Sequence, residues 1–402
     1  MKTLLKNAKI FGGETADILV EDGIIAGIGS YEGADEIHDM SGYAAVLPGV
    51  IDAHMHIVTG DIEYNDRALK SWARSGVTTV RDLGIGTDKT AHPTQEFLSY
   101  RKTIEDDPES AQCLTCGRFV AQYKGLNHIM SDGAETGYGC ATPEDAVNAV
   151  NELIDMGCEG IKTSVGRGMD GKSEVLDVPK LKAIADTAKA RGVWCTAHVL
   201  DAELVPRLLE AGIPELAHMP TDYVSDELLK EIAERKIPVV PTLCSINAPR
   251  PPMPEGAKPP MMPGMPGGPG GPGGPGGMPP MMMKDPKEQE KICVDNCRRF
   301  HEAGGMLVVG TDTMRMEAQP HVAVMPVREF QLLHEAGLCV EEVIDAATIN
   351  AAKVCYIDKE VGSIDVGKKA NIIAVKDEID ETFQALAHVE FVMNLGKVIK
   401  KD

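Results

Sequence analysis

Short apolar stretches interrupted by Gly and Asp mark both ends of the chain. Near the N-terminus they are 8–13, 16–30 and 43–49, and near the C-terminus they are 361–376 and 388–402. Apolar runs of this length, bounded by turn-forming residues, are typical of β-strands. We therefore expect residues 1–48 and 360–402 to meet in one small β domain, a β-sandwich formed from both chain termini.

Between these ends, strand-like and helix-like segments alternate. The strand-like segments are 49–57, 76–84, 110–120, 158–166, 192–199, 214–219, 237–246 and 306–314. Most of them follow a helix-like stretch that ends in Gly, which is the usual residue after the last turn of a helix. Strands that alternate with helices form a parallel sheet, so the pattern predicts an α/β fold. Eight such units predict a closed (β/α)8, TIM-like barrel over residues 49–359.

One segment breaks this alternation. Residues 249–286 consist mainly of Pro, Gly and Met with few charges, a composition that forms neither a packed helix nor a strand. The segment follows the seventh strand-like stretch, which places it at the C-terminal rim of the barrel, where barrel active sites lie. Three interpretations stay open: a tolerated flexible loop, a mobile cover that contacts substrate through Met, and a soft-metal (copper) site.

Composition and charge exclude several classes of partner. Aromatic residues make up only 4% of the chain, so the core is expected to consist of aliphatic side chains. The formal net charge of −21 argues against binding to nucleic acid or to an anionic membrane surface.

The sequence shows neither a membrane-spanning run nor a signal-peptide pattern, so the ten cysteines are expected to be reduced in the cytosol. A homo-oligomer is compatible with the sequence.

Two histidines stand two residues apart in the first barrel segment, "PGVIDAHMHI". Successive side chains of a strand point to opposite faces, so His54 and His56 share one face. In the first strand of a barrel that face points inward, where two imidazoles can bind a divalent metal. The alternative is one buried histidine with a hydrogen-bond partner and one solvated histidine.

Four further polar residues end other strand-like segments. They are Lys162, His198, His218 and Asp312. The C-terminal ends of barrel strands are where catalytic residues lie, so these side chains are expected to converge on the histidine pair. Burial near metal ions would favour the neutral amine of Lys162, which can take up CO2 and become a carbamate. The alternative for Lys162 is a side chain that extends to the rim.

These motifs resemble the amidohydrolase superfamily, and in particular its branch of imidazolonepropionase-like hydrolases and metal-dependent Xaa-Pro dipeptidases (prolidases). The matching stretches are "PGVIDAHMHI", "SGVTTVRDLG", "GIKTS", "TAH", "AHM", "GTD", "ATINAAKV" and "VGSIDVGKKANIIAV". The resemblance covers nearly the whole chain outside residues 249–286. One departure is "ELAHMP", where the family more often has His followed by Gly.

The resemblance implies a metal-binding role for each of these residues. His54 and His56 would bind the more buried ion together with Asp312. His198 and His218 would bind the more exposed ion, and carboxylated Lys162 would bridge both. Zinc is expected, and the ligand types also suit manganese or cobalt. Asp312 would act as general base and then as general acid in the hydrolysis of an amide.

Substrate recognition is expected to involve residues in the loops after the strands. His128, after the third strand-like segment, matches a position where relatives carry a histidine that faces the substrate carbonyl, and we also count it as a catalytic candidate. The alternative for His128 is an ordinary loop histidine. Tyr223, Arg167 and Arg315 are candidates for contact with a substrate carboxylate, but an ordinary position on the rim is the favoured interpretation of each. Arg81 and Asp82 are expected to form a structural pair beneath the site.

The sequence therefore predicts a metal-dependent hydrolase of amide bonds that acts on a small amide or dipeptide. Dipeptides ending in proline are the substrates to try first. An alternative is a cyclic amidohydrolase that opens imidazolonepropionate or a hydantoin. A second alternative, from outside the enzymes, is a catalytically inactive scaffold with an amidohydrolase fold.

Overall fold

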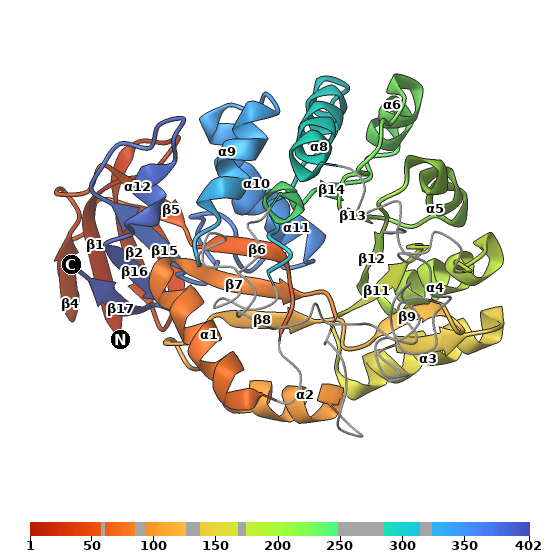
Figure 1. Cartoon of the computed structure of the whole chain (residues 1–402). Coiled ribbons are helices and arrows are strands. Elements are labelled where there is room, and N and C mark those ends of the chain that lie inside the picture. Colours follow the sequence, from red (N-terminus) through yellow and green to blue (C-terminus); the bar gives the residue numbers. More distant parts are fainter. Residues whose placement is uncertain (58–60, 85–92, 126–136, 168–173, 248–284, 314–323) are drawn as a thin grey trace, which may run out of the picture.

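The computed structural model describes residues 1–57, 61–84, 93–125, 137–167, 174–247, 285–313 and 324–402. Parallel strands run through the centre of the larger part of the molecule (Figure 1). They are β6 Val50–Met55, β7 Val77–Asp82, β8 Gln112–Thr115, β9 Phe119–Gln122, β11 Gly160–Ser164, β12 Trp194–His198, β13 Leu216–Ala217 and β14 Val239–Val240. They follow the predicted order of the barrel, and β8 and β9 both begin within the third predicted segment, 110–120. One sheet contains β6, β7 and β8; the next contains β9 and β11 to β14, with β10 Gly137–Cys140 at its edge beside β9.

The segment 306–313 joins the two ends of this series. On one side, the N–H of Val239 donates to the carbonyl of Met306 and the N–H of Val308 donates to the carbonyl of Val239. On the other side, the N–H of Ala53 donates to the carbonyl of Val309, and further backbone bonds link residues 54–56 to 311–313. The segment thus lies between β14 and β6, in the position of the eighth barrel strand.

Helices cover the outside of these strands (Figure 1). They are α1 Ile62–Ser75, α2 Pro93–Thr103, α3 Pro143–Met156, α4 Val178–Arg191, α5 Val205–Ala211, α6 Asp226–Glu234, α8 Pro286–Glu302, α9 Val327–Glu335, α10 Val340–Ala347 and α11 Ile349–Val354. The predicted Gly stops are confirmed at Gly157, Gly192 and Gly212, which end α3, α4 and α5 in the left-handed conformation. None of the helices in the described ranges is both long enough and apolar enough to span a membrane.

Strands from both chain ends build two four-stranded sheets beside the barrel. One contains β1 Lys2–Lys9, β2 Thr15–Glu21, β3 Ile24–Gly29 and β4 Glu36–Asp39; the other contains β5 Ala45–Pro48, β15 Ile372–Val375, β16 Phe391–Asn394 and β17 Lys397–Lys401. Both termini lie in this part of the molecule (Figure 1). β5 pairs antiparallel with β15, so residues far apart in the sequence share one sheet.

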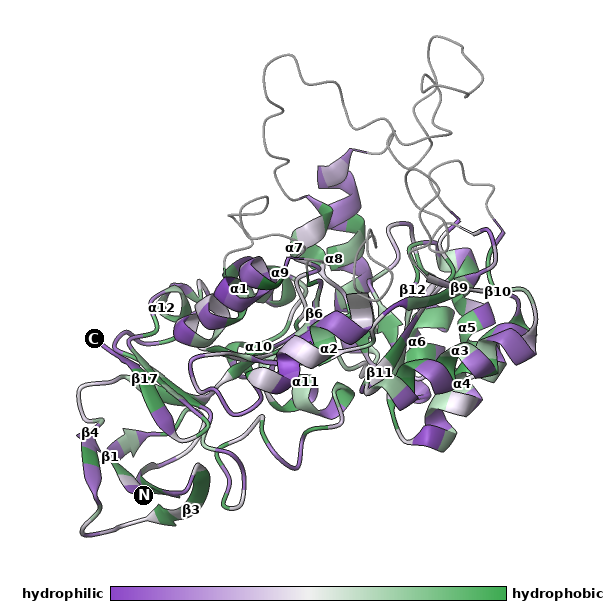
Figure 2. Cartoon of the chain, turned by 90° about the horizontal axis from the view of Figure 1, so that it is seen from below, coloured by the Kyte–Doolittle hydropathy of each residue, from purple (hydrophilic) through white to green (hydrophobic). Residues whose placement is uncertain are grey.

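The two sheets pack face to face around their own apolar core. Leu5 and Ile18 from the first sheet belong to the same buried cluster as Ile372 and Phe391 from the second. The alternation of hydrophobic and hydrophilic residues along these strands can be followed in Figure 2. The fold is thus an α/β barrel of TIM type with a small β-sandwich made from both termini, as predicted. The domain boundaries 1–48 plus 360–402, and 49–359, stay a prediction.

Three local predictions need correction. The stretch 110–120 is not one strand, because the chain bends between β8 and β9, where Gly117 adopts a φ of 65°. The stretch 237–246 contains only the short strand β14, and residues 243–246 form helix α7 Leu243–Ile246. Pro286 is the first residue of α8, where the missing N–H of proline costs no hydrogen bond. Residues 249–284 of the Pro/Gly/Met-rich segment lie outside the described residues.

A buried ion pair lies within the barrel. Arg81 and Glu215 have side-chain exposures of 0% and 4%, and two guanidinium nitrogens of Arg81 lie 2.9 and 2.5 Å from the two carboxylate oxygens. The predicted pairing of Arg81 with Asp82 is wrong, because neighbouring residues of a strand point to opposite faces. Asp82 instead accepts hydrogen bonds from the hydroxyl of Thr115 and the N–H of Ile57.

Removing the charge of Glu215 should destabilise the barrel. We expect Glu215→Gln to lower the free energy of unfolding by about 3–5 kcal/mol, because it leaves the guanidinium of Arg81 buried without its anion. The measurement is urea unfolding followed by circular dichroism. Glu210→Gln, at an exposed position of the same helix–strand unit, is the matched control. A loss below about 1 kcal/mol, the value of a surface pair, would contradict the prediction.

Candidate metal centre

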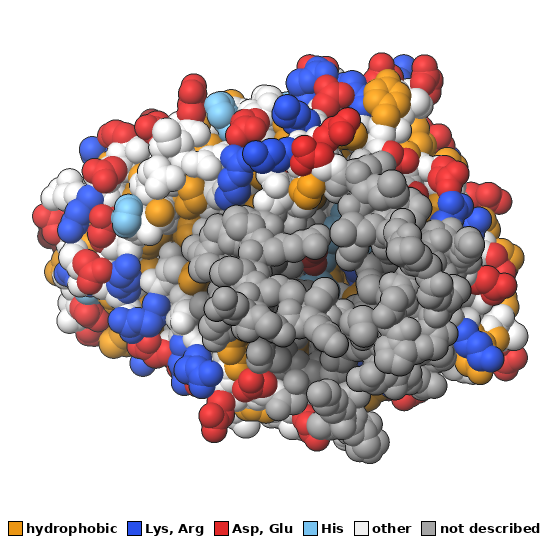
Figure 3. Space-filling view, viewed as in Figure 1, with side chains coloured by type: hydrophobic (Ala, Val, Ile, Leu, Met, Phe, Trp, Pro, Cys, Tyr) orange, Lys and Arg blue, Asp and Glu red, His pale blue; other side chains and the backbone are white. Residues whose placement is uncertain are grey.

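Four imidazoles and one carboxylate gather at the C-terminal ends of the barrel strands. His54 lies in β6, and His56 follows the last residue of that strand. His198 ends β12, and His218 directly follows β13. Asp312 lies in the eighth-strand segment 306–313. Imidazole and acidic side chains are visible at the centre of the face shown in Figure 3. The predicted convergence of these strands thus occurs in the structure.

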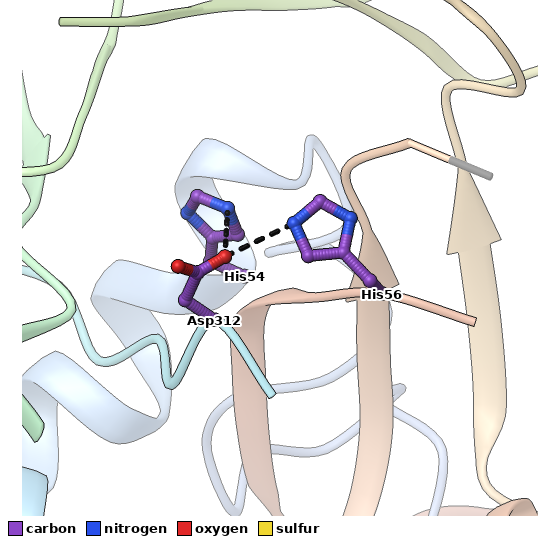
Figure 4. A group of neighbouring side chains, drawn as sticks. All are labelled: His54, His56 and Asp312. Carbon is purple, nitrogen blue, oxygen red and sulfur yellow. Dashed lines mark hydrogen bonds and ion pairs between the residues drawn. The ribbon is translucent and has the colours of Figure 1, made fainter. Parts of the chain in front are cut away.

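Asp312 lies directly against the histidine pair of the first strand (Figure 4). Its Oδ1 atom is 3.0 Å from Nε2 of His56 and 3.3 Å from Nε2 of His54. One ligand atom from each of these three side chains lies within 4.8 Å of the others. The three donors are therefore close enough to bind one cation.

His218 and His198 extend this group. The ring centroid of His218 is 4.8 Å from that of His54 and 4.6 Å from that of His198. Burial lowers the pKa of His54 and of His218 well below the ordinary value, and it lowers the pKa of His198 to about 4. Burial thus keeps these three rings neutral, the form in which histidine binds a metal.

Hydrogen bonds at Nδ1 fix the orientation of two rings. Nδ1 of His56 lies 2.9 Å from the carbonyl oxygen of Gly84, and Nδ1 of His218 lies 2.7 Å from the hydroxyl of Thr242. A carbonyl oxygen can only accept, so Nδ1 of His56 carries a proton. In the neutral ring, Nε2 of His56 would then direct its lone pair at Oδ1 of Asp312.

A lone pair that faces a carboxylate oxygen requires a cation between them. Without a metal, a second proton on His56 meets this need. Burial works to lower the pKa of His56, but the hydrogen bond and the charge of Asp312 raise it. Burial likewise works to raise the pKa of Asp312, but His56 holds it below the ordinary value. A divalent ion bound by His54, His56 and Asp312 would replace that proton.

Lys162 lies in β11 with only 1% of its surface exposed. Burial lowers the pKa of its ammonium to about 8, although the charge of Asp312 works in the opposite direction. Its Nζ atom makes no hydrogen bond to any residue within the described ranges, and the same holds for Nδ1 of His54, whereas Nε2 of His54 has only its 3.3 Å contact with Asp312. Buried polar atoms normally have partners, so these orphaned donors and acceptors fit a site that binds metal ions.

Asp52 is a supporting residue that sequence reasoning missed. Its carboxylate accepts hydrogen bonds from the N–H of His54, from the N–H of Thr311 and from the hydroxyl of Thr311, at 3.1, 3.1 and 2.6 Å. These bonds tie the strand of the histidine pair to the segment that carries Asp312. The available signal was the position of Asp52 two residues before His54, on the same face of the strand.

The backbone is unusual at two of the six predicted metal ligands. His218 and Asp312 have φ angles of 72° and 55°, in the left-handed region that few residues other than glycine adopt. Asp and His adopt this region more readily than most residues other than glycine, but such positions are still uncommon. Such conformations cluster at functional sites, where the surrounding structure enforces them.

The predicted substrate-binding residues are only partly described. The side chain of Tyr223 is 63% exposed and stacks on the guanidinium of Arg299, with a distance of 4.4 Å from the ring centroid. Arg167 forms an ion pair with Glu203 at the surface. Neither Arg299 nor Glu203 belongs to the histidine group, which consists of His54, His56, His198, His218 and Asp312. His128 and Arg315 lie outside the described residues, so their roles stay predictions.

A comparison of the whole chain with known proteins supports the resemblance seen in its motifs. A model of the amidohydrolase family matches residues 45–400. The chain belongs to the amidohydrolase family. As an amidohydrolase it is a hydrolase that acts on carbon–nitrogen bonds, and the family is generally metal-dependent. The group of His54, His56 and Asp312 is a candidate metal site in this chain.

Individual relatives support the same assignment. An imidazolonepropionase of Clostridium tetani is 24% identical over an aligned length of 403 positions. The alignment covers 90% of this chain and 84% of that protein. A Xaa-Pro dipeptidase with methionine bound in its active site has 21% identity and a TM-score of 0.76, with 100% of both chains covered. A putative prolidase from Bifidobacterium longum has 25% identity and a TM-score of 0.77, covering 99% of this chain and 94% of that one.

Binding of a divalent metal should stabilise the protein through His54. After removal of metal with a chelator, zinc or manganese at about 100 times its dissociation constant should stabilise the wild type by about 2.7 kcal/mol. His54→Asn should lose most of this gain, since it removes a buried ligand. Thermal unfolding with and without added metal measures the effect.

The matched control for His54→Asn is His388→Asn, at an exposed histidine. It should respond to metal as the wild type does. An equal metal-dependent shift in His54→Asn and the wild type would contradict the placement of the site.

Proposed function

We propose that this amidohydrolase cleaves amide bonds with two divalent ions bound at the histidine group. His54, His56 and Asp312 would hold the more buried ion, and His198 and His218 would hold the more exposed ion. The observation that carries the proposal is the contact of four imidazoles and one carboxylate at a single mouth of the barrel. Zinc suits these nitrogen and oxygen donors best, and manganese or cobalt would also fit.

Lys162 would complete the group as a carbamate. Burial favours its neutral amine, which can add CO2 and release a proton to form an anionic carbamate. The carbamate would supply oxygen ligands for both ions. Its negative charge would also help to neutralise the two dications, because the neutral imidazoles beside it bring no negative charge.

The reaction follows from the side chains of this chain. The bound ions would supply an activated water and polarise the substrate carbonyl. Oδ1 of Asp312 faces the two imidazoles, so we assign the mobile proton to Oδ2. Asp312 accepts the proton of the water and then delivers it to the departing nitrogen. Such protonation is what an amide requires, since its nitrogen is a poor leaving group.

Dipeptides that end in proline are the substrates we favour. The supporting observations are the motifs of the prolidase branch and the full-length structural similarity to a Xaa-Pro dipeptidase. Tyr223, Arg167, Arg315 and His128 stay candidates for substrate contacts.

The main alternative is the opening of a cyclic amide such as imidazolonepropionate or a hydantoin. The similarity to an imidazolonepropionase over 90% of the chain supports it. A panel of dipeptides, N-acyl amino acids and cyclic amides, assayed with added zinc or manganese, would separate the two. The scaffold alternative is disfavoured because the chain carries the whole expected ligand set, including Asp312.

Asp312→Asn should abolish most turnover while metal content stays normal. Asparagine tolerates the left-handed backbone at this position and keeps one oxygen ligand, but it cannot accept and return a proton. We expect kcat to fall by a factor of about 10²–10⁴. Steady-state kinetics on the best substrate of the panel, with metal analysis of the same preparation, measures both quantities. An active variant would refute the role of Asp312 as general base.

Replacement of Lys162 should reduce metal content. The wild type, purified without chelator and in the presence of bicarbonate, should contain about two ions per chain. Lys162→Met should contain fewer, and intact-mass spectrometry under native conditions should show one added CO2 in the wild type but none in Lys162→Met. Lys182→Met, at an exposed lysine, is the control. Equal metal content in Lys162→Met and wild type would contradict the bridging role.

A further inference from the structure

The loop after β14 contacts the metal centre through one hydroxyl group. Thr242 is buried, with 1% of its surface exposed, and its Oγ1 atom lies 2.7 Å from Nδ1 of His218. A histidine that binds a metal through Nε2 carries its ring proton on Nδ1, which needs an acceptor. Within the described residues, Thr242 is the group placed to accept this proton.

Thr242 holds a conformation that its residue type disfavours. Its φ is 51°, and a β-branched residue in the left-handed region is an outlier that the surroundings must enforce. The next residues begin helix α7, and the hydroxyl and the N–H of Ser245 both donate to the carbonyl of Thr242. Such an energetically unfavourable backbone conformation is expected where it holds the hydroxyl of Thr242 at the position from which it contacts His218.

Glu329, in α9, is the residue that enforces this turn. Its carboxylate has 0% exposure, with one oxygen 3.0 Å from the N–H of Leu243 and the other 2.7 Å from the N–H of Cys244. These are the two N–H groups that directly follow Thr242. A buried carboxylate from another helix thus fixes the backbone beside the hydroxyl that contacts His218.

The same turn also reaches the segment of Asp312. The thiol of Cys244 lies 3.6 Å from the carbonyl oxygen of Thr311. Thr311 in turn is held by Asp52, which also binds the N–H of His54. The start of α7 therefore contacts two of the proposed metal-binding segments, that of His218 and that of Asp312.

We propose that Thr242 is a positioning residue for metal binding and that Glu329 acts through it. This role rests on the function proposed above. Thr242 accepts the Nδ1 proton of His218, and Nε2 of His218 then presents its lone pair to the ion shared with His198. Glu329 holds Thr242 in the conformation that makes this contact. Neither residue touches substrate or metal.

Paired substitutions of Thr242 test the role of the hydroxyl. Thr242→Val keeps the shape but removes the acceptor, so we expect metal affinity to fall about 10–100-fold. Thr242→Ser keeps the hydroxyl and should stay within a few-fold of the wild type. The measurement is titration of the metal-stripped full chain with zinc against a chromophoric chelator, with thermal unfolding of each metal-free variant alongside.

Substitution of Glu329 tests whether this residue affects metal binding through Thr242. Glu329→Gln offers one carbonyl oxygen to two N–H groups, so it should weaken zinc binding in the same direction as Thr242→Val. The double variant should bind zinc as weakly as Thr242→Val alone, because both changes act through one contact. Glu335→Gln, at an exposed position of the same helix, is the control and should leave affinity unchanged.

The outcomes distinguish this inference from the proposed function. A loss in Thr242→Val that Thr242→Ser restores, with similar stability of the metal-free variants, supports the inference. Wild-type affinity in Thr242→Val, or an equal loss in Thr242→Ser, overturns it. Additive effects of Thr242→Val and Glu329→Gln overturn the connection between them. Absence of zinc binding by the wild type overturns the proposed function itself.

Discussion

The carboxylate of Asp52 connects the first and last strands of the barrel at the level of the metal centre. It binds the backbone of His54 on one side and the backbone and hydroxyl of Thr311 on the other. The two strands carry ligands that are more than 250 positions apart in the sequence, as the separation of 256 between His56 and Asp312 shows. The geometry of His54 and Asp312 therefore depends on one buried group that takes no part in the chemistry.

Burial determines the charge states of the groups beneath and around the site. Arg81 and Glu215 neutralise each other within the barrel, and Arg81 also donates hydrogen bonds to the carbonyls of Ala53 and Val354. The rings of His54, His198 and His218 are kept neutral by the same lack of water. Neutral imidazole nitrogens next to one carboxylate suit a divalent cation, because these are the ligand atoms that zinc prefers.

Much of the fold and of the candidate site could be predicted from the sequence. The period of apolar segments and the Gly stops indicated alternating strands and helices, and the position of His54, His198, His218 and Asp312 at strand ends indicated their convergence. The pairing of Arg81 with Glu215 could not be predicted, because the partner lies 134 positions away, directly before β13, and no local pattern marks it. Thr242 and Glu329 were also missed, since their function depends on a backbone conformation that no local pattern reveals.

The pairing of β5 with β15 has a consequence for how the chain matures on the ribosome. Ala45–Pro48 leaves the exit tunnel early, yet its strand neighbour Ile372–Val375 is translated more than 300 positions later. The intervening barrel can collapse while that edge waits with its peptide groups unpaired, and unpaired edges attract other chains. The β5–β15 contact can therefore form only after residues 372–375 have been made, when almost the whole barrel has already been translated.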